Sequence, residues 1–320
     1  MVVIGDLMSK ISIRFNNWFE RNIQPQLRKM VGLDDYFRES KERIETIEYI
    51  INHSLDITKM SKSTGEQRQM QIIGAEVLRI VHEVCVKYGL SYWIDWGTLL
   101  GAVRHGGFVP WDDDLDISMP IDDFKKACKI FPDEFNKYKD YGLFAEVTNY
   151  NVMAVTLWHA GVLLDVVATD NMCFNKSKDE IQARYKVLID FQKNSKDLSF
   201  EEKFKKQYEI MGENNNDNPI WYQPGYNNEA AIFENNIIFP INTVLFEGYR
   251  VCAPKDIQNY LKICYGDYMS FPKSGILKHH GGKGKPLHYN ITKYSLNTED
   301  LLSRLRALSP LSNNLVNDNT

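Results

Sequence analysis

The chain has 320 residues, of which 43% are hydrophobic and 25% charged, so it can bury a substantial core in one large domain or two small ones. The net charge of -4 argues against a nucleic-acid-binding body, and no nucleic-acid partner is expected. Five cysteines without Cys-x-x-Cys spacing favour a reducing compartment over a disulfide framework or a zinc site. The sequence has neither an apolar run of spanning length nor a signal-peptide pattern, so we expect a cytoplasmic protein.

Residues 1–70 read as an N-terminal helical region. Between residues 10 and 31, apolar side chains recur every three or four residues among basic ones, and Pro25 is expected to divide this segment into two helices. Such a segment could lie peripherally on the inner face of the plasma membrane, or dock on its own protein or on a second subunit. A further helical stretch is predicted over 34–57, followed by a polar linker over 61–67.

Residues 71–175 are predicted to form the core, an α+β unit. The spacing predicts a buried helix over 74–89 that ends at Gly89. Apolar runs predict a small mixed or antiparallel sheet of about four or five strands, flanked by helices. The predicted strands are 92–95, 144–147, 152–158 and 162–169, with a helix over 121–131.

A Gly-Thr turn follows the first predicted strand. Gly97 has no side chain, so backbone N–H groups can approach a phosphate, and the Thr98 hydroxyl can donate to a phosphate oxygen. Arg104, at the end of the next short helical stretch, either contacts the same phosphate or pairs with Asp112 or Asp113. The Gly97-Thr98 pair alone is weak evidence for a phosphate site, but its position just before a run of aspartates strengthens that evidence.

The run Asp114-Leu115-Asp116-Ile117 alternates acidic and apolar residues. On a strand this puts both carboxylates on one face, about 7 Å apart, where they can share a pair of divalent cations. Asp165 interrupts an apolar strand-like run and is the natural third ligand, because a buried charge needs a partner. We predict a site for two Mg2+ ions, or for Mn2+, with Asp112 at its edge. The same alternation turns the Asp113 side chain away from the metals, so Asp113 is expected to be structural.

Residues 176–295 are predicted to add helices over 178–211, strands over 237–239 and 243–246, and a helix over 255–265. Trp221 and Tyr222 lie in an aromatic-rich turn, which either holds a cationic headgroup or simply packs. Lys278 and His279 lie in a basic, glycine-containing loop that either contacts substrate or is solvated. Residues 296–320 are predicted to form a C-terminal helix and a frayed tail.

Three stretches together resemble a known family: Trp93 to His105, Pro110 to Asp116, and Tyr260 to Met269. Their order resembles the polymerase-beta-like nucleotidyltransferase fold, and more narrowly the LicD family, which contains phosphocholine transferases and is related to the fukutin-type transferases. The resemblance runs with gaps from about Ile72 to His288. The first two stretches are long enough to make it specific.

The resemblance implies Mg2+-dependent transfer of a phospho-substituent, phosphocholine foremost, from a CDP-linked donor to a hydroxyl of a cell-surface or capsular glycan precursor. The acceptor would be a saccharide or lipid-linked glycan, and CMP would be released. Asp114, Asp116 and Asp165 would be the catalytic, metal-binding residues, and Gly97, Thr98 and Arg104 would bind the donor phosphates. Alternatives are phosphoethanolamine, aminoethylphosphonate or polyol phosphate transfer, a nucleotidyltransferase proper, a glycosyltransferase with an Asp-x-Asp motif, and a metal-stabilised saccharide-binding module.

Overall fold

A computed structural model describes residues 20–30, 32–149, 152–157, 162–172, 177–195, 197–212, 220–224, 229–271 and 295–310. Its residues divide into two compact units, one comprising the described residues up to Asp56 and the other those of 57–270 and 295–310. The predicted α+β class is confirmed. The division of the chain at residues 70, 175 and 295 stays a prediction.

The first unit contains α2 (Gln24–Met30) and α3 (Leu33–Ser54). The helix α2 begins one residue before Pro25, where the break was predicted, and α3 matches the predicted helical stretch. Large apolar side chains on α3 are exposed, among them Tyr36, Phe37, Ile44, Ile47 and Ile50. Of the helices in the described ranges, none combines the length and the hydropathy that a membrane crossing requires. Half of the segment 10–31 lies outside the described residues, and its membrane-surface position stays a prediction.

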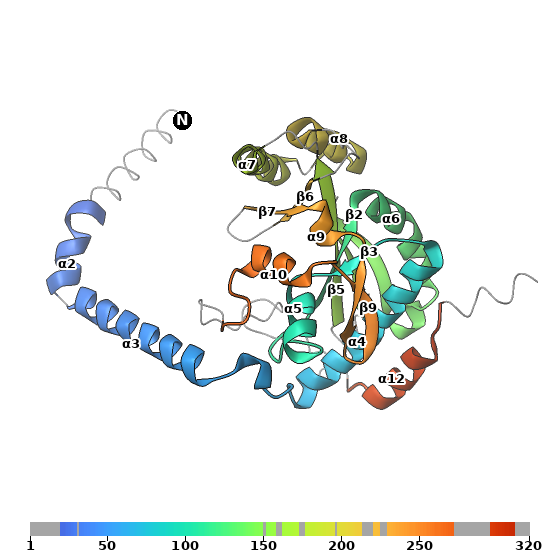
Figure 1. The fold of residues 1–320 in the computed structure, drawn as a ribbon, viewed down its shortest axis with the longest axis horizontal. Coiled ribbons are helices and arrows are strands. Elements are labelled where there is room, and N and C mark those ends of the chain that lie inside the picture. The colour runs from blue at the N-terminus through green and yellow to red at the C-terminus, as the bar shows by residue number, and fades with distance from the viewer. Residues whose placement is uncertain are drawn as a thin grey trace, which may run out of the picture. The chain divides into compact units, whose positions relative to one another are not determined.

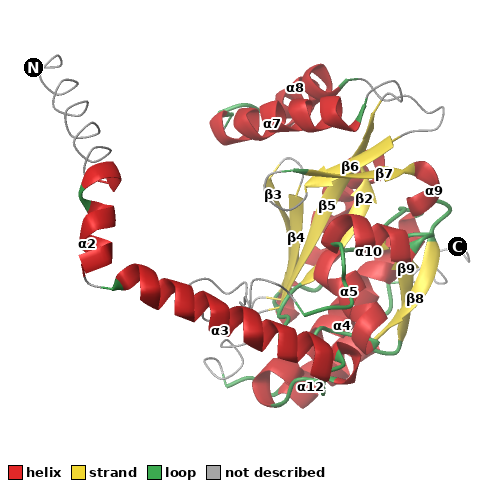
Figure 2. Ribbon diagram, turned by 60° about the vertical axis from the view of Figure 1, so that its left-hand side comes forward, coloured by secondary structure: helices red, strands yellow, loops and turns green. Residues whose placement is uncertain are grey.

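The second unit is built on a mixed sheet (Figures 1 and 2). Its main path runs in the order β1-β2-β5-β4-β3, with β2 and β5 parallel and the other pairs antiparallel. The far half of β5 pairs with β6, which pairs with β7, and β8 and β9 form a separate hairpin. The strands are β1 (Trp93–Ile94), β2 (Leu115–Pro120), β3 (Leu143–Asn149), β4 (Val152–Leu157), β5 (Val162–Met172), β6 (Ile220–Pro224), β7 (Ala230–Glu234), β8 (Asn242–Phe246) and β9 (Tyr249–Ala253).

Helices cover this sheet. The main ones are α4 (Gly65–Tyr88), α5 (Trp96–His105), α6 (Ile121–Asn136), α7 (Lys178–Asn194), α8 (Phe200–Met211), α9 (Asn235–Ile238), α10 (Ile257–Tyr265) and α12 (Thr298–Ala307), with short 3-10 turns at Ile57–Lys59 and Lys139–Tyr141. The central helix is α4, whose apolar stripe, including Ile73, Val77 and Val81, is fully buried. Gly74 lets α4 approach the sheet, since a Cβ there would lie 3.4 Å from Leu115 Cδ1 and 3.1 Å from the Phe108 ring.

The structure corrects three expectations. The predicted strand 237–239 is wrong, because Ile237 and Ile238 belong to the helical turn α9 and Phe239 is its C-cap. The Ile237 and Ile238 carbonyls accept from the N–H groups of Asp256 and Lys255. The predicted aromatic turn contains the strand β6, and the whole sheet has seven strands. The helix predicted to begin at residue 74 begins at Gly65. Gly74 lies inside this helix, where its missing side chain allows close packing.

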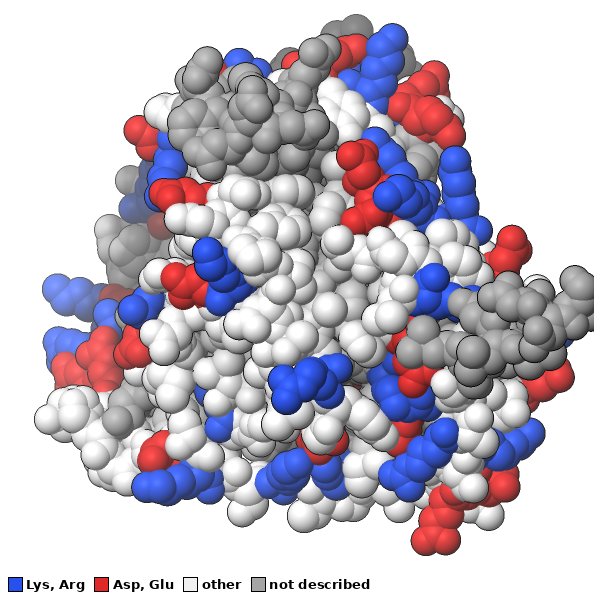
Figure 3. Space-filling model, turned by 45° about the vertical axis from the view of Figure 1, so that its right-hand side comes forward, with Lys and Arg blue, Asp and Glu red and all other residues white. Residues whose placement is uncertain are grey.

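The surface carries charges of both signs. On the face drawn in Figure 3, basic and acidic side chains are interspersed around a central area of uncharged residues.

Candidate active site

The strands β2 and β5 carry two of the predicted site residues side by side. Leu115, Ile117 and Met119 of β2 are buried, and α4 packs on Leu115. Alternation then turns Asp116 to the opposite face of the sheet. Asp116 is the register partner of Asp165 on the neighbouring parallel strand, so their side chains rise from the same face of adjacent strands.

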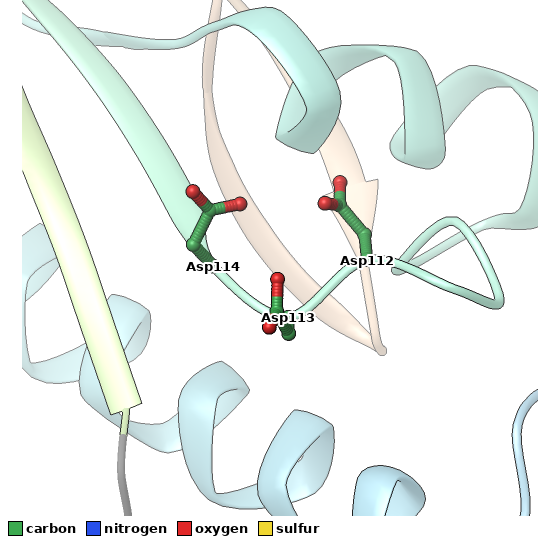
Figure 4. A group of neighbouring side chains, drawn as sticks. All are labelled: Asp112, Asp113 and Asp114. Atoms are coloured by element: carbon green, nitrogen blue, oxygen red, sulfur yellow. The ribbon is translucent and has the colours of Figure 1, made fainter. Parts of the chain in front are cut away.

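The loop before β2 brings three more carboxylates together. Asp112, Asp113 and Asp114 each offer an oxygen, and these oxygens all lie within 4.8 Å of one another (Figure 4). Alternation along a strand predicted that Asp113 would point away from the cluster. The loop is not paired into the sheet at these residues, so that alternation does not govern it, and the Asp113 side chain is buried beside the other two.

The electrostatics of Asp116 reflect this crowding. Burial raises its pKa first, and the neighbouring carboxylates of Asp114, Asp112, Asp95 and Asp165 raise it further, well above the usual range. Each of these causes disfavours the charged form, and a bound cation would reverse that penalty. Carboxylate oxygens are the ligands that Mg2+ and Mn2+ take in proteins, so the residues present fit such an ion.

The N-terminus of α5 lies against the aspartate cluster. A Cβ on Gly97 would overlap Asp112 Oδ2, so the missing side chain is what lets this carboxylate approach the helix end. The Thr98 hydroxyl accepts a hydrogen bond from the Asp116 N–H at 2.8 Å, which leaves its own proton to donate elsewhere. Trp96, the first helical residue, has a left-handed φ of 42°, a conformation that costs energy outside glycine.

A buried polar network that the sequence did not reveal supports this corner. Asp95 is fully buried and caps α5 by accepting from the Trp96 N–H at 2.7 Å. Its other oxygen accepts from Ser118 Oγ at 2.6 Å and from Gln223 Nε2 at 2.9 Å. Gln223 Nε2 also donates to the Tyr260 hydroxyl at 2.9 Å. The network links α5, β2, β6 and α10 on the face of β2 that carries Asp116. Burial raises the pKa of Asp95, against these hydrogen bonds.

Arg104 lies at the other end of α5. Its Nη2 donates to the Ser270 carbonyl at 2.9 Å, and no hydrogen bond or ion pair to Asp112 or Asp113 is formed within the described residues. Its Nε is buried and has no hydrogen-bond partner in the described part of the chain. Burial lowers the pKa of Arg104, although Tyr265, Asp267 and Tyr268 act to raise it. The guanidinium therefore keeps an unused donor.

The predicted headgroup contacts occupy different surroundings. Trp221 is buried, stacks at a tilt on Phe239, and donates from Nε1 to Asn235 at 2.9 Å. Tyr222 is buried, and its hydroxyl accepts from Gln207 at 3.1 Å. For both residues the structure shows the packing alternative. Lys278 and His279 lie outside the described residues.

Comparison with known proteins agrees with this geometry. Residues 89–256, slightly more than half of the chain, match the family described as LicD/FKTN/FKRP, nucleotidyltransferase domain. This range contains the α5 N-terminus, the aspartate cluster and the strand β5 with Asp165.

Individual relatives match over shorter stretches. The lipopolysaccharide cholinephosphotransferase LicD of Haemophilus influenzae is 37% identical over 71 residues, which cover 22% of this chain and 27% of the relative. The human ribitol 5-phosphate transferase FKRP is 44% identical over 48 residues, covering 15% of this chain and 10% of the relative. An uncharacterized protein of Rickettsia typhi is 50% identical over 90 residues, 26% of this chain and 28% of that protein. The matched stretches thus span about a quarter or less of these relatives' lengths. The family match, in contrast, covers more than half of this chain and includes the aspartate cluster. The chain therefore belongs to the LicD/FKTN/FKRP family.

Proposed function

We propose that the protein transfers a phospho-substituent from a CDP-linked donor to a hydroxyl of a cell-surface glycan precursor, with release of CMP. Phosphocholine is the foremost group, because the name of the Haemophilus influenzae relative states cholinephosphotransferase activity. The name of the human relative, a ribitol 5-phosphate transferase, supports the coarser class of phospho-substituent transfer.

The single observation that carries the proposal is the register of Asp116 with Asp165 beside the Asp112–Asp114 cluster. Five carboxylates lie together around β2 and β5 and repel one another; burial, and after it the neighbouring carboxylates, raise the pKa of Asp116. In our proposal Asp114, Asp116 and Asp165 hold Mg2+. Bound there, the ion would neutralise charge on the phosphate oxygens of the donor.

The residues around the cluster would bind the donor. The hydroxyl proton of Thr98 and the backbone N–H groups at the start of α5 face the cluster side of the helix, where a helix end favours an anion. Arg104, at the other end of α5, would contact a more distant phosphate oxygen or the ester oxygen of the donor through its guanidinium. We therefore place the pyrophosphate along α5.

The reaction we propose is an in-line displacement at phosphorus. The acceptor oxygen forms a bond to the phosphorus of the substituent while the bond from that phosphorus to the CMP oxygen breaks. Asp165 takes the proton of the acceptor hydroxyl, and CMP leaves with the electron pair of the broken bond. A nucleotidyltransferase proper would instead direct the acceptor oxygen to the phosphorus next to cytidine, so that CMP is joined to the acceptor and the phosphorylated headgroup leaves; with CTP as donor the leaving group would be pyrophosphate.

Product analysis tests the proposal. The protein is incubated with CDP-choline, CDP-ethanolamine, CDP-ribitol or CDP-glycerol, with Mg2+ and a glycan acceptor extract, and the products are followed by 31P NMR. We expect CMP and a new phosphodiester signal on the glycan fraction, both absent with Asp116→Asn. Release of the free phosphorylated headgroup, with CMP joined to the acceptor, would favour the nucleotidyltransferase. Binding of glycan without consumption of any donor would favour the saccharide-binding module.

A further inference from the structure

The segment Gly106–Asp114, here called the aspartate loop, leads from α5 to β2 and carries Asp112, Asp113 and Asp114. Its residues form no helix or strand. A loop of this kind needs outside support, because backbone carbonyls buried without partners are costly. The support comes from side chains on α4 and on the β8–β9 turn.

The first support is Gln71 of α4, which is 1% exposed. Its Nε2 donates to the carbonyl oxygen of Asp112 at 3.0 Å and lies 3.3 Å from that of Val109 and 3.4 Å from that of Pro110. Gln67, one turn earlier, donates to the Pro110 carbonyl at 3.1 Å. The carbonyl oxygens of the aspartate loop are therefore turned toward α4.

The orientation of the Gln71 amide is fixed from behind. Its Oε1 accepts from Ser63 Oγ at 2.6 Å and from Arg68 Nη1 at 3.3 Å. A flipped amide would direct this oxygen at three carbonyl oxygens and lose both donors, so the observed orientation is strongly preferred.

The second support is Glu247, from the β8–β9 turn, whose side chain is 7% exposed. Its Oε1 accepts from the Phe108 N–H at 3.3 Å, and its own N–H donates to the Gly106 carbonyl at 2.9 Å. Gly107 leaves the room this needs, because a Cβ there would overlap the Glu247 carboxylate.

Glu247 is in turn held by two cations. Arg68 makes a bidentate pair with it at 2.9 and 2.7 Å, and Lys62 adds a contact at 2.8 Å. Arg68 thus contacts both supports, since it also donates to Gln71. Both ends of the aspartate loop are tied to one charged and amide-rich cluster, while Asp112 and Asp114 project from the same side of the loop (Figure 4).

From this arrangement we propose that Gln71 and Glu247 are positioning residues for the cation-binding carboxylates. They hold the backbone of the aspartate loop by its carbonyl and N–H groups, which sets where the Asp112 and Asp114 carboxylates lie. The inference rests on the proposed function, in that these carboxylates must bind a cation. Residues that orient metal ligands change metal affinity by about 10–100-fold when they are replaced.

The test measures Mn2+ affinity by calorimetry and electron paramagnetic resonance, on the full chain without any donor. Gln71→Met keeps the size of the side chain and removes the amide. Val77→Ala, on the same helix and fully buried, is the matched control for loss of stability alone. We expect Gln71→Met to lower Mn2+ affinity by about 10–100-fold. Val77→Ala should melt earlier and keep the wild-type affinity.

Glu247→Gln is the second variant, and it lies away from the α4 core in case Gln71→Met fails to fold. It retains an acceptor for the Phe108 N–H but loses the charge that Arg68 and Lys62 hold, so we expect a smaller loss of Mn2+ affinity in the same direction. Wild-type affinity in both variants would overturn the inference and leave the proposed function intact. A wild-type protein that binds no Mn2+ would overturn both.

Discussion

Two groups of buried acids in the second unit have opposite surroundings. Glu76, Glu134 and Glu247 on the rim of α4 and its neighbours each contact basic side chains. Glu134 accepts from Lys87 at 2.9 Å, Lys137 at 2.7 Å and the Tyr88 hydroxyl at 2.7 Å. Burial acts to raise the pKa of Glu134, but these hydrogen bonds outweigh it and bring the pKa to about 2.

Asp116 of β2 shows the reverse. The causes acting on Asp116 are burial and four other carboxylates, and all of them raise its pKa. The comparison teaches that the rim glutamates are electrostatically satisfied by the chain itself. Under the proposed function, a cation from solution would provide the positive charge that the aspartate cluster lacks.

The largest expected effect is a loss of turnover when the aspartate cluster is changed. Asp116→Asn removes a central carboxylate, and we expect turnover to fall by roughly 10²–10³-fold or more, the scale of losing a preorganised charge-stabilising group. The melting temperature without metal should not fall, because repulsion is relieved. Glu134→Gln, the same chemical change on the rim, should melt earlier and keep its turnover. Wild-type turnover in Asp116→Asn would contradict the assignment of the site.

Cation binding should separate the two groups directly. Mg2+ or Mn2+ at about 100 times its dissociation constant should raise the free energy of unfolding by about 2.7 kcal/mol, since it binds only the folded chain. Thermal and denaturant unfolding measure this shift. Glu134→Gln should keep the stabilisation and Asp116→Asn should lose it. An equal response in both variants would place the cation elsewhere.

The rim can be probed by pH. Glu134 has a folded pKa of about 2 against an ordinary value of 4.5, so the stabilisation it provides is present above pH 4.5 and is lost as the pH falls from 4.5 toward 2. Glu134→Gln should therefore cost about 1–3 kcal/mol at neutral pH. The difference from wild type should shrink across that window in urea unfolding series. A constant difference down to pH 2 would contradict the cause given for the lowered pKa.

The smallest effect sharpens the geometry of the cluster. Gly97→Ala places a methyl group against the Asp112 carboxylate, which must move. We expect turnover to fall about tenfold, the scale of a misplaced supporting group. The melting temperature should stay equal or rise, because alanine favours a helix over glycine. Gly106→Ala, at a left-handed position with open space around it, is the comparison for a purely conformational penalty.

Local patterns in the sequence carried much of the fold. Three predictions each used a pattern within a single element: the apolar stripe of α4, the alternation of β2 and the apolar run with one acid in β5. The structure contains a helix or a strand at each of these places. The predicted convergence of Asp116 and Asp165 required only that their strands be neighbours, which the parallel pairing of β2 and β5 provides. The catalytic and metal-binding roles of these residues stay predictions.

The missed features depend on contacts far apart in sequence. The sequence predicts Asp95 only as the last residue of the strand 92–95. The fold alone brings Gln223 of β6 to its carboxylate, and Tyr260 of α10 to Gln223. The same holds for Glu247, which local sequence shows as one residue of a hairpin turn. For Trp221 the sequence left both the headgroup contact and simple packing open, because aromatic content does not tell whether a ring is buried. In the structure the ring packs against Phe239. A local pattern also does not tell whether the apolar residues of α3 are buried, and in the structure they are exposed.

The parallel pairing of β2 with β5 has a consequence for biosynthesis. Between these strands the chain passes through α6, β3 and β4, so β5 docks beside β2 only after that crossover is complete. A nascent chain that has emerged only as far as β4 holds Asp116 without Asp165. Under the proposed function, full-strength binding of a divalent ion would therefore require β5 to be in place beside β2. In a series of ribosome-stalled chains of increasing length, protection by Mn2+ against protease should begin only once β5 has left the exit tunnel.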